Sequence, residues 1–135
     1  MARVLFVCLH NAGRSQISEA LFRKAAGTRH ECSSAGSAAD PEGKIHANVL
    51  EAMGEIGVDL SHASPNPLTY QMAEQADVIV TMGCGDACPI FPGKRYLDWD
   101  LPDPKNLELD EVRVLRDEIA RRVEELVSRL DANRS

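Results

Sequence analysis

The chain has 135 residues, of which 44% are hydrophobic and 27% charged, and this composition predicts one globular domain over residues 1–135 rather than a disordered chain. The formal net charge of −6 argues against a protein that binds nucleic acid or anionic membranes, since both need a basic face. No apolar run reaches the roughly 20 residues of a membrane span and no signal cleavage site follows the short apolar start, so we expect a cytoplasmic protein with no membrane partner.

Strand patterns alternate with amphipathic helix patterns along the chain. In chain order they predict a strand over 3–8, a helix over 16–26, a strand over 30–35, a helix over 42–56, a short helix over 67–75, a strand over 77–82, a strand over 94–97 and a helix over 109–130. Gly57 is expected to end the second helix, and Asn66 to cap the third with Pro67 in its first turn. The alternation predicts an α/β fold with an open, mostly parallel sheet and helices on both faces.

Three chemically distinctive features follow predicted strands. They are Cys8, the loop over 83–93 with its glycines and cysteines, and the acidic stretch over 98–103. In open α/β sheets, ligands bind beyond the carboxyl ends of the strands. We therefore expect these three features to meet at one edge of the sheet.

A cysteine, an arginine and a serine, spaced C-x5-R-S, stand between the first strand and the first helix as Cys8, Arg14 and Ser15. A short loop that enters a helix points several backbone N–H groups inward and forms a nest for an anion. Arg14 adds a planar, bidentate donor that suits a tetrahedral oxyanion. The same positive field favours the nucleophilic thiolate of Cys8, to which Ser15 can donate a hydrogen bond. A purely structural Arg14 is disfavoured, because arginine in a first helical turn opposes the helix dipole.

With this motif, the chain resembles the low-molecular-weight tyrosine phosphatases and their arsenate reductase relatives. The resemblance implies a four-stranded parallel sheet flanked by helices, with flavodoxin-like topology. It also implies that Cys8 attacks the oxyanion, that Arg14 holds the equatorial oxygens, and that Asn11 shapes the loop by hydrogen bonds, for which a left-handed backbone suits asparagine. The oxyanion-binding residues are then Leu9, His10, Asn11, Ala12, Gly13, Arg14 and Ser15, with His10 expected to be exposed.

The same resemblance implies that an Asp-Pro dipeptide supplies the general acid. The matching dipeptide is Asp103-Pro104 in the stretch "WDLPDP". Asp98 and Asp100 lie nearby in sequence and remain alternative acids. A simple turn role for Asp103 before proline is an equally weighted alternative.

Two further cysteines, Cys84 and Cys88, separate a reductase from a phosphatase. Both classes form a covalent adduct on the first cysteine, but only a reductase then needs additional thiols. The stretch "TMGCGDACPIFPGKRYLDW" resembles the thioredoxin-coupled arsenate reductases, although only three residues separate its cysteines. This resemblance implies a disulfide that forms between Cys8 and Cys84, moves to Cys84–Cys88, and is reduced by thioredoxin. Arsenate is then the substrate, with phosphate or sulfate as oxyanion mimics, and no cofactor or metal is predicted.

Three alternatives stay open at this point. The first is a phosphatase that hydrolyses phosphomonoesters through a Cys8 phospho-enzyme, which leaves Cys84 and Cys88 without a role. The second is a non-catalytic module that binds oxyanions or senses redox state. The third is a metal site in which His10 or His62 joins the C-x3-C pair. The fourth cysteine, Cys32, is expected to be a buried, inert strand residue.

Overall fold

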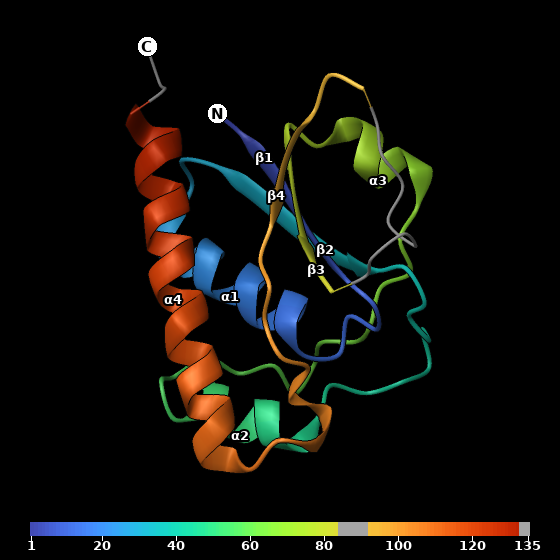
Figure 1. Cartoon of the computed structure of the whole chain (residues 1–135), viewed down its shortest axis with the longest axis vertical. Helices are drawn as coiled ribbons and strands as arrows, with labels where there is room; N and C mark the ends of the chain where they lie inside the picture. The colour runs from blue at the N-terminus through green and yellow to red at the C-terminus, as the bar shows by residue number, and fades with distance from the viewer. Residues whose placement is uncertain (84–91, 133–135) are drawn as a thin grey trace.

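The computed structural model describes residues 1–83 and 92–132, and its central feature is a parallel β-sheet (Figure 1). The strands are β1 (Arg3–Cys8), β2 (Glu31–Gly36), β3 (Val78–Met82) and β4 (Arg95–Asp98). They lie in the order β2-β1-β3-β4, and every neighbouring pair is parallel. The strand order reverses at β1, where Cys8 pairs with Gly36 on one side and Met82 on the other. The carboxyl ends of β1 and β3 are therefore the topological switch point at which such folds bind ligands.

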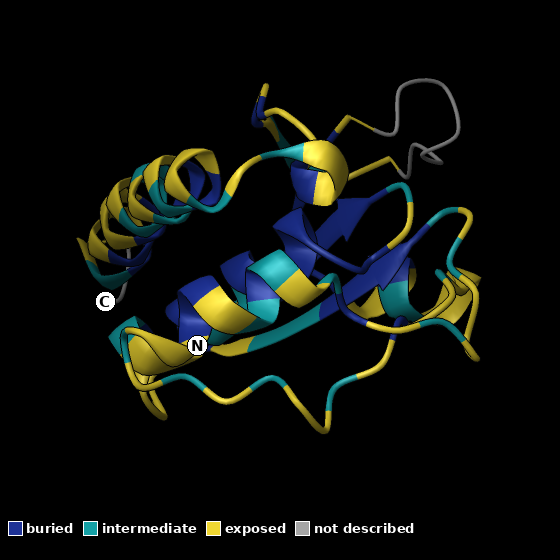
Figure 2. Ribbon diagram, turned by 90° about the horizontal axis from the view of Figure 1, so that it is seen from below, coloured by how far each residue is buried: buried dark blue, intermediate teal, exposed yellow. Residues whose placement is uncertain are grey.

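Helices cover both faces of this sheet, as the sequence predicted. They are α1 (Arg14–Ala26), α2 (Ala47–Gly54), α3 (Tyr70–Gln75) and α4 (Leu109–Ala132), with a short 3-10 helix η2 (Pro104–Asn106) before α4. The large core joins α1, α2 and α4 to one face of β1 and β3, whereas Ala73 of α3 packs with Leu5 and Val7 on the other. β1 and β3 are buried along most of their length, whereas β4 is not, and Figure 2 shows α4 exposed on its outer side. Because β1 is covered from both sides, it reads as a continuous apolar run.

The helix predicted over 42–56 is shorter in the structure, and that prediction was wrong at its start. His46 has an extended ψ of 137°, and its backbone N–H donates to the Ala12 carbonyl at 3.1 Å. This tertiary hydrogen bond holds the segment before Ala47 outside the helix. At the other end α2 stops at Gly54, two residues before the predicted end, and Gly57, with a φ of +81°, ends the turn that follows.

The cap predicted for the third helix was also wrong. Thr69 caps α3 by accepting a hydrogen bond from the Met72 N–H at 3.2 Å. Asn66 and Pro67 instead lie beside the end of β2, where the Gly36 N–H donates to the Asn66 carbonyl at 2.8 Å. Among the described residues, no helix is both long enough and apolar enough to cross a membrane.

Candidate active site

The sulfur of Cys8 lies under the loop that joins β1 to α1. Cys8 is 2% exposed, and its Sγ lies 2.8 Å from Ser15 Oγ and 3.2 Å from the Asn11 N–H. Asn11 Nδ2 donates to the same Ser15 oxygen at 2.6 Å, which leaves the Ser15 hydroxyl hydrogen available for the sulfur. Two donors therefore face Sγ, the arrangement that stabilises a thiolate. The contact between Cys8 and Ser15 is the one expected from the motif.

Asn11 organises this loop from within. Its φ of 54° is left-handed, as its residue type predicted, and its side chain is fully buried. Besides donating to Ser15, its amide accepts from the Asn66 N–H at 2.8 Å and from Gln16 Nε2 at 2.9 Å. Gln16 in turn donates to the Ser64 carbonyl at 3.1 Å. Sequence reasoning missed Gln16 as a loop support, because a glutamine in a first helical turn carries no signal of its partner.

The floor of the loop is the backbone of Gly36 at the end of β2. A Cβ at Gly36 would stand 2.8 Å from the Leu9 carbonyl oxygen and 2.9 Å from the Asn11 nitrogen. Hydrogen bonds continue this contact, because the Ser37 N–H donates to the Cys8 carbonyl at 3.0 Å. Only glycine permits this approach of two backbones. A glycine at the end of a predicted strand was the available signal for it.

Arg14 joins the loop to two distant segments. It is 8% exposed, and its Nη1 donates to the Leu101 carbonyl at 3.0 Å. Its Nη2 lies 3.8 Å from Asp103 Oδ2. Gly83, with a φ of +75°, packs so closely that a Cβ there would stand 2.5 Å from Nη1. Arg14 therefore joins the Cys8 loop to Gly83 and to the stretch after β4, as predicted for the part of the 83–93 loop that the structure describes.

The candidate acids separate in the structure. Asp103 lies beside Arg14, with its side chain 44% exposed, and its Oδ1 accepts from the Lys105 N–H at 3.0 Å. Asp98 accepts instead from Thr81 Oγ1 at 2.9 Å on the neighbouring strand. The structure thus brings Asp103 to the motif and holds Asp98 in the sheet.

The remaining loop residues differ in exposure. Asn11, Ala12, Gly13, Arg14 and Ser15 are buried, Leu9 is half-buried, and His10 is exposed as expected. The backbone of the loop and the guanidinium of Arg14 are the groups available to hold a tetrahedral anion over Cys8.

A family model described as low molecular weight phosphotyrosine protein phosphatase matches residues 3–135. The chain belongs to the low molecular weight phosphotyrosine protein phosphatase family. It is 36% identical over 126 residues to a putative arsenate reductase from Halobacterium salinarum, which covers 90% of this chain and 87% of that protein. The structure of a thioredoxin-dependent arsenate reductase from Corynebacterium glutamicum is 42% identical, with a TM-score of 0.83 over 99% of this chain. This chain spans only 63% of that structure.

Structures named for a different reaction are also similar to this chain. An arginine phosphatase variant, solved with a phosphorylated active-site serine, is 28% identical to this chain, with a TM-score of 0.83. The match covers 98% of this chain and 97% of that one. The shared fold therefore fits both a reductase and a phosphatase, and the choice depends on residues outside the Cys8–Arg14 motif.

Of the three cysteines besides Cys8, the structure describes only Cys32. Cys84 and Cys88 lie outside the described residues. Cys32 is half-buried rather than buried, and its Sγ contacts the Glu19 carbonyl at 3.6 Å. Partial burial raises the pKa of Cys32 to about 11, so its thiol stays protonated and unreactive at neutral pH. This raised pKa agrees with the expectation that Cys32 is inert.

Proposed function

We propose that this chain is an arsenate reductase, in which Cys8 attacks arsenate and two further cysteines carry the resulting disulfide away. One observation carries the proposal: Gly83, the residue that precedes Cys84 in the sequence, packs against Arg14 beside the Cys8 loop. Cys84 and Cys88 follow this contact in the sequence. A reductase needs such additional thiols, whereas a phosphatase does not need them. The similar proteins named arsenate reductases support the same choice.

In the first step, the thiolate of Cys8 attacks the arsenic atom. A sulfur–arsenic bond forms and an arsenic–oxygen bond breaks, and the leaving oxygen departs as water after Asp103 donates a proton. Arg14 and the loop amides hold the remaining oxygens, where negative charge gathers in the transition state. The Asn11 N–H and the Ser15 hydroxyl, both in contact with Cys8 Sγ, would hold the sulfur in place for the attack.

In the next steps, electrons pass from sulfur to arsenic. The thiolate of Cys84 attacks Cys8 Sγ, so that a disulfide forms, the sulfur–arsenic bond breaks and its electron pair reduces arsenic(V) to arsenic(III), released as arsenite. The thiolate of Cys88 then attacks Cys84, which frees Cys8 and leaves a Cys84–Cys88 disulfide. A dithiol protein of the thioredoxin type reduces this bond and takes the disulfide itself.

A phosphatase is the second candidate, favoured by the family and by the phosphorylated serine of the arginine phosphatase structure. In that reaction water, rather than Cys84, would attack the Cys8 adduct and release phosphate. Arg14 and the loop amides would serve both reactions, since both begin on a tetrahedral oxyanion.

The test couples arsenate turnover to thioredoxin, thioredoxin reductase and NADPH. We expect the wild type to oxidise one NADPH for each arsenate reduced, and Cys8→Ser, Cys84→Ser and Cys88→Ser each to lose turnover. Cys32→Ser is the matched control, expected to stay within about twofold of the wild type because its thiol remains protonated. Turnover that survives in Cys84→Ser would contradict the cascade and favour a low-molecular-weight thiol, such as mycothiol or glutathione, as the reductant.

The order of the disulfides has a separate measurement. One equivalent of arsenate is added to the reduced protein without thioredoxin, and the disulfides are mapped by mass spectrometry. We expect a Cys84–Cys88 bond in the wild type and a Cys8–Cys84 bond in Cys88→Ser. Phosphate release from an aryl phosphate, with no disulfide formed from arsenate, would favour the phosphatase.

A further inference from the structure

One side chain of α2 binds the turn that follows Asp103. Asn48 Nδ2 donates to the Pro104 carbonyl at 2.7 Å and to the Leu107 carbonyl at 3.0 Å. These two carbonyls face the amide from the start and the end of η2, so a single side chain spans the whole turn. The neighbouring Val49 is completely buried in the core, which gives Asn48 a rigid base.

The position of Asp103 follows the position of this turn. Its Oδ1 accepts from the Lys105 N–H inside the turn, whereas its Oδ2 faces Arg14 at 3.8 Å. Pro104 also packs on the oxyanion loop, because a Cβ at Gly13 would stand only 2.5 Å from Pro104 Cγ. A shift of the turn would therefore move the carboxyl group of Asp103 relative to Arg14.

The amide of Asn48 is poorly arranged for stability alone. Its Oδ1 is buried and has no hydrogen-bond partner among the described residues. A buried acceptor without a partner costs free energy, and this cost offsets part of what the two donated hydrogen bonds contribute to stability. What the asparagine adds is the pair of donors that fixes the turn.

We propose that Asn48 is a positioning residue that holds the 104–107 turn so that Asp103 reaches the leaving oxygen. This inference rests on the proposed function, because it concerns the proton transfer of its first step. There the O–H bond of the Asp103 carboxyl breaks as the arsenic–oxygen bond breaks, water leaves, and Asp103 remains as a carboxylate. Asn48 contacts none of the reacting atoms and acts only through the turn.

The experiment is a double-mutant cycle between Asn48 and Asp103. We expect Asp103→Asn to lower kcat for arsenate about 10²-fold, the effect of losing a general acid. Asn48→Ala should lower kcat about tenfold with KM within about twofold, because the hydrogen bonds of Asn48 go to the turn and not to the oxyanion loop. In the Asp103→Asn background, Asn48→Ala should lower kcat by less than about twofold, since no acid remains to be positioned. Independent, multiplying effects, or a change in KM alone, would overturn the proposal.

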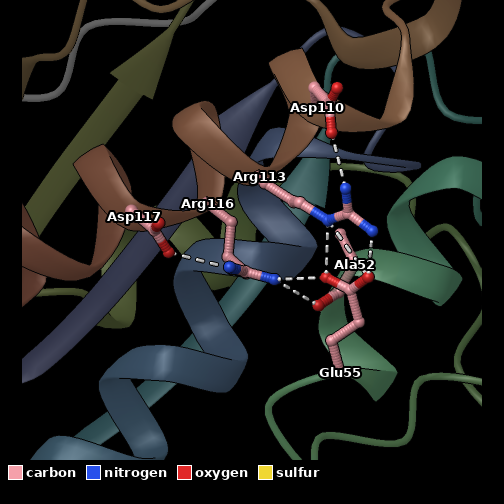
Figure 3. Close-up of polar contacts among 6 residues, drawn as sticks. All are labelled: Ala52, Glu55, Asp110, Arg113, Arg116 and Asp117. Atoms are coloured by element: carbon pink, nitrogen blue, oxygen red, sulfur yellow. Dashed lines mark hydrogen bonds and ion pairs between the residues drawn. The ribbon is translucent and has the colours of Figure 1, made fainter.

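A second variant and a control exclude a loss of folding as the cause. Asn48→Asp keeps the size of the side chain but turns a donor toward the two carbonyls into an acceptor, and it should show the same dependence on Asp103. Arg116→Ala is the control, because Arg116 Nη1 binds the other end of α2 through the Ala52 carbonyl at 2.8 Å (Figure 3). It should keep kcat within about twofold of the wild type, and an equal loss would show that general loosening of α2 explains the effect.

Phenyl phosphate, measured in parallel, separates this inference from the proposed function. Its leaving oxygen needs the same proton, so the cycle between Asn48 and Asp103 should show the same non-additivity. If the wild type hydrolyses phenyl phosphate but fails to reduce arsenate, the proposed function is overturned while the role of Asn48 is still decided by the cycle.

Discussion

Two polar networks in this molecule differ in burial. Around the Cys8 loop, the side chains of Asn11, Ser15 and Gln16 are uncharged, at most 5% exposed and linked by hydrogen bonds through Asn11. Around Glu55, ion pairs link α2 to α4: the carboxylate accepts from Arg113 Nε at 3.0 Å and from Arg116 Nη1 at 2.9 Å (Figure 3). Those side chains remain 33%, 39% and 11% exposed.

This difference indicates that the number of charges in a network is a poor guide to how much the network contributes to stability and activity. Water competes for the exposed arginines and carboxylates, so losing one contact there is largely compensated. A donor left unpaired beside Cys8 has no such replacement and bears the full desolvation cost. The network with fewer charges is therefore expected to be the more sensitive of the two, in stability and in activity.

The largest effect should come from Asn11. Asn11→Ala removes one hydrogen bond each from Ser15, Gln16 and the Asn66 N–H, and it forces alanine into a φ of 54°. We expect a loss of about 2–4 kcal/mol in the free energy of unfolding, measured by urea denaturation, together with loss of turnover. Asn11→Gly keeps the left-handed backbone, so it should recover only the backbone part, about 1 kcal/mol. Full recovery by glycine would show that the hydrogen bonds contribute little.

An intermediate effect is expected at Gly83, where backbone and active site meet. Gly83→Ala would place a methyl group 2.5 Å from Arg14 Nη1 and displace the guanidinium, so kcat/KM for arsenate should fall about 10–10²-fold. Gly93→Ala is the matched control, because Gly93 has a similar φ of +84° but nothing within 4 Å of a Cβ. Both variants share the backbone strain and only Gly83→Ala moves Arg14, so equal kinetics would refute the steric explanation.

The smallest effect should come from the exposed network, and it depends on pH. Hydrogen bonds from Arg113, supported by Arg116, lower the pKa of Glu55 from 4.5 to about 2. A carboxylate with a lowered pKa stabilises the fold fully above pH 4.5, and this contribution disappears as the pH falls toward 2. The difference in thermal stability between wild type and Glu55→Gln should therefore be small at pH 7. It should decrease toward zero as the pH falls from 4.5 to 2. A difference that grows on acidification would contradict the assignment.

The elements that sequence patterns predicted well are those with strong periodicity. The strand over 3–8 matches β1, and the helix over 109–130 matches α4 within two residues at its end. The errors at α2 and α3 have one cause, because His46 and Asn66 both bind the oxyanion loop through their backbones. Such tertiary hydrogen bonds override local propensity and leave no local signal.

The sequence predicted which residues the candidate site brings together, including Asn11 as a support of the loop, but not the backbone contacts around them. Cys8, Arg14 and Ser15 carry recognisable residue types at a fixed spacing, and Asp103 was one of three neighbouring acids. The Leu101 carbonyl, by contrast, holds Arg14 with a backbone atom that every residue possesses. The role of Asn48 could not be predicted either, since its partners are also backbone carbonyls, 56 and 59 residues away in the sequence. Residue identity does not encode contacts of this kind.

The close contact between Gly36 and the Cys8 loop has a consequence for redesign of the site. At Gly36, main chain rests on main chain, so there is no side chain that can be trimmed to enlarge the space or extended to shrink it. Tuning for a larger or smaller oxyanion must therefore begin at the rim, where His10 is exposed and Asp103 is partly so. A mutant library aimed at altered anion preference would place its diversity on that rim and keep the floor constant.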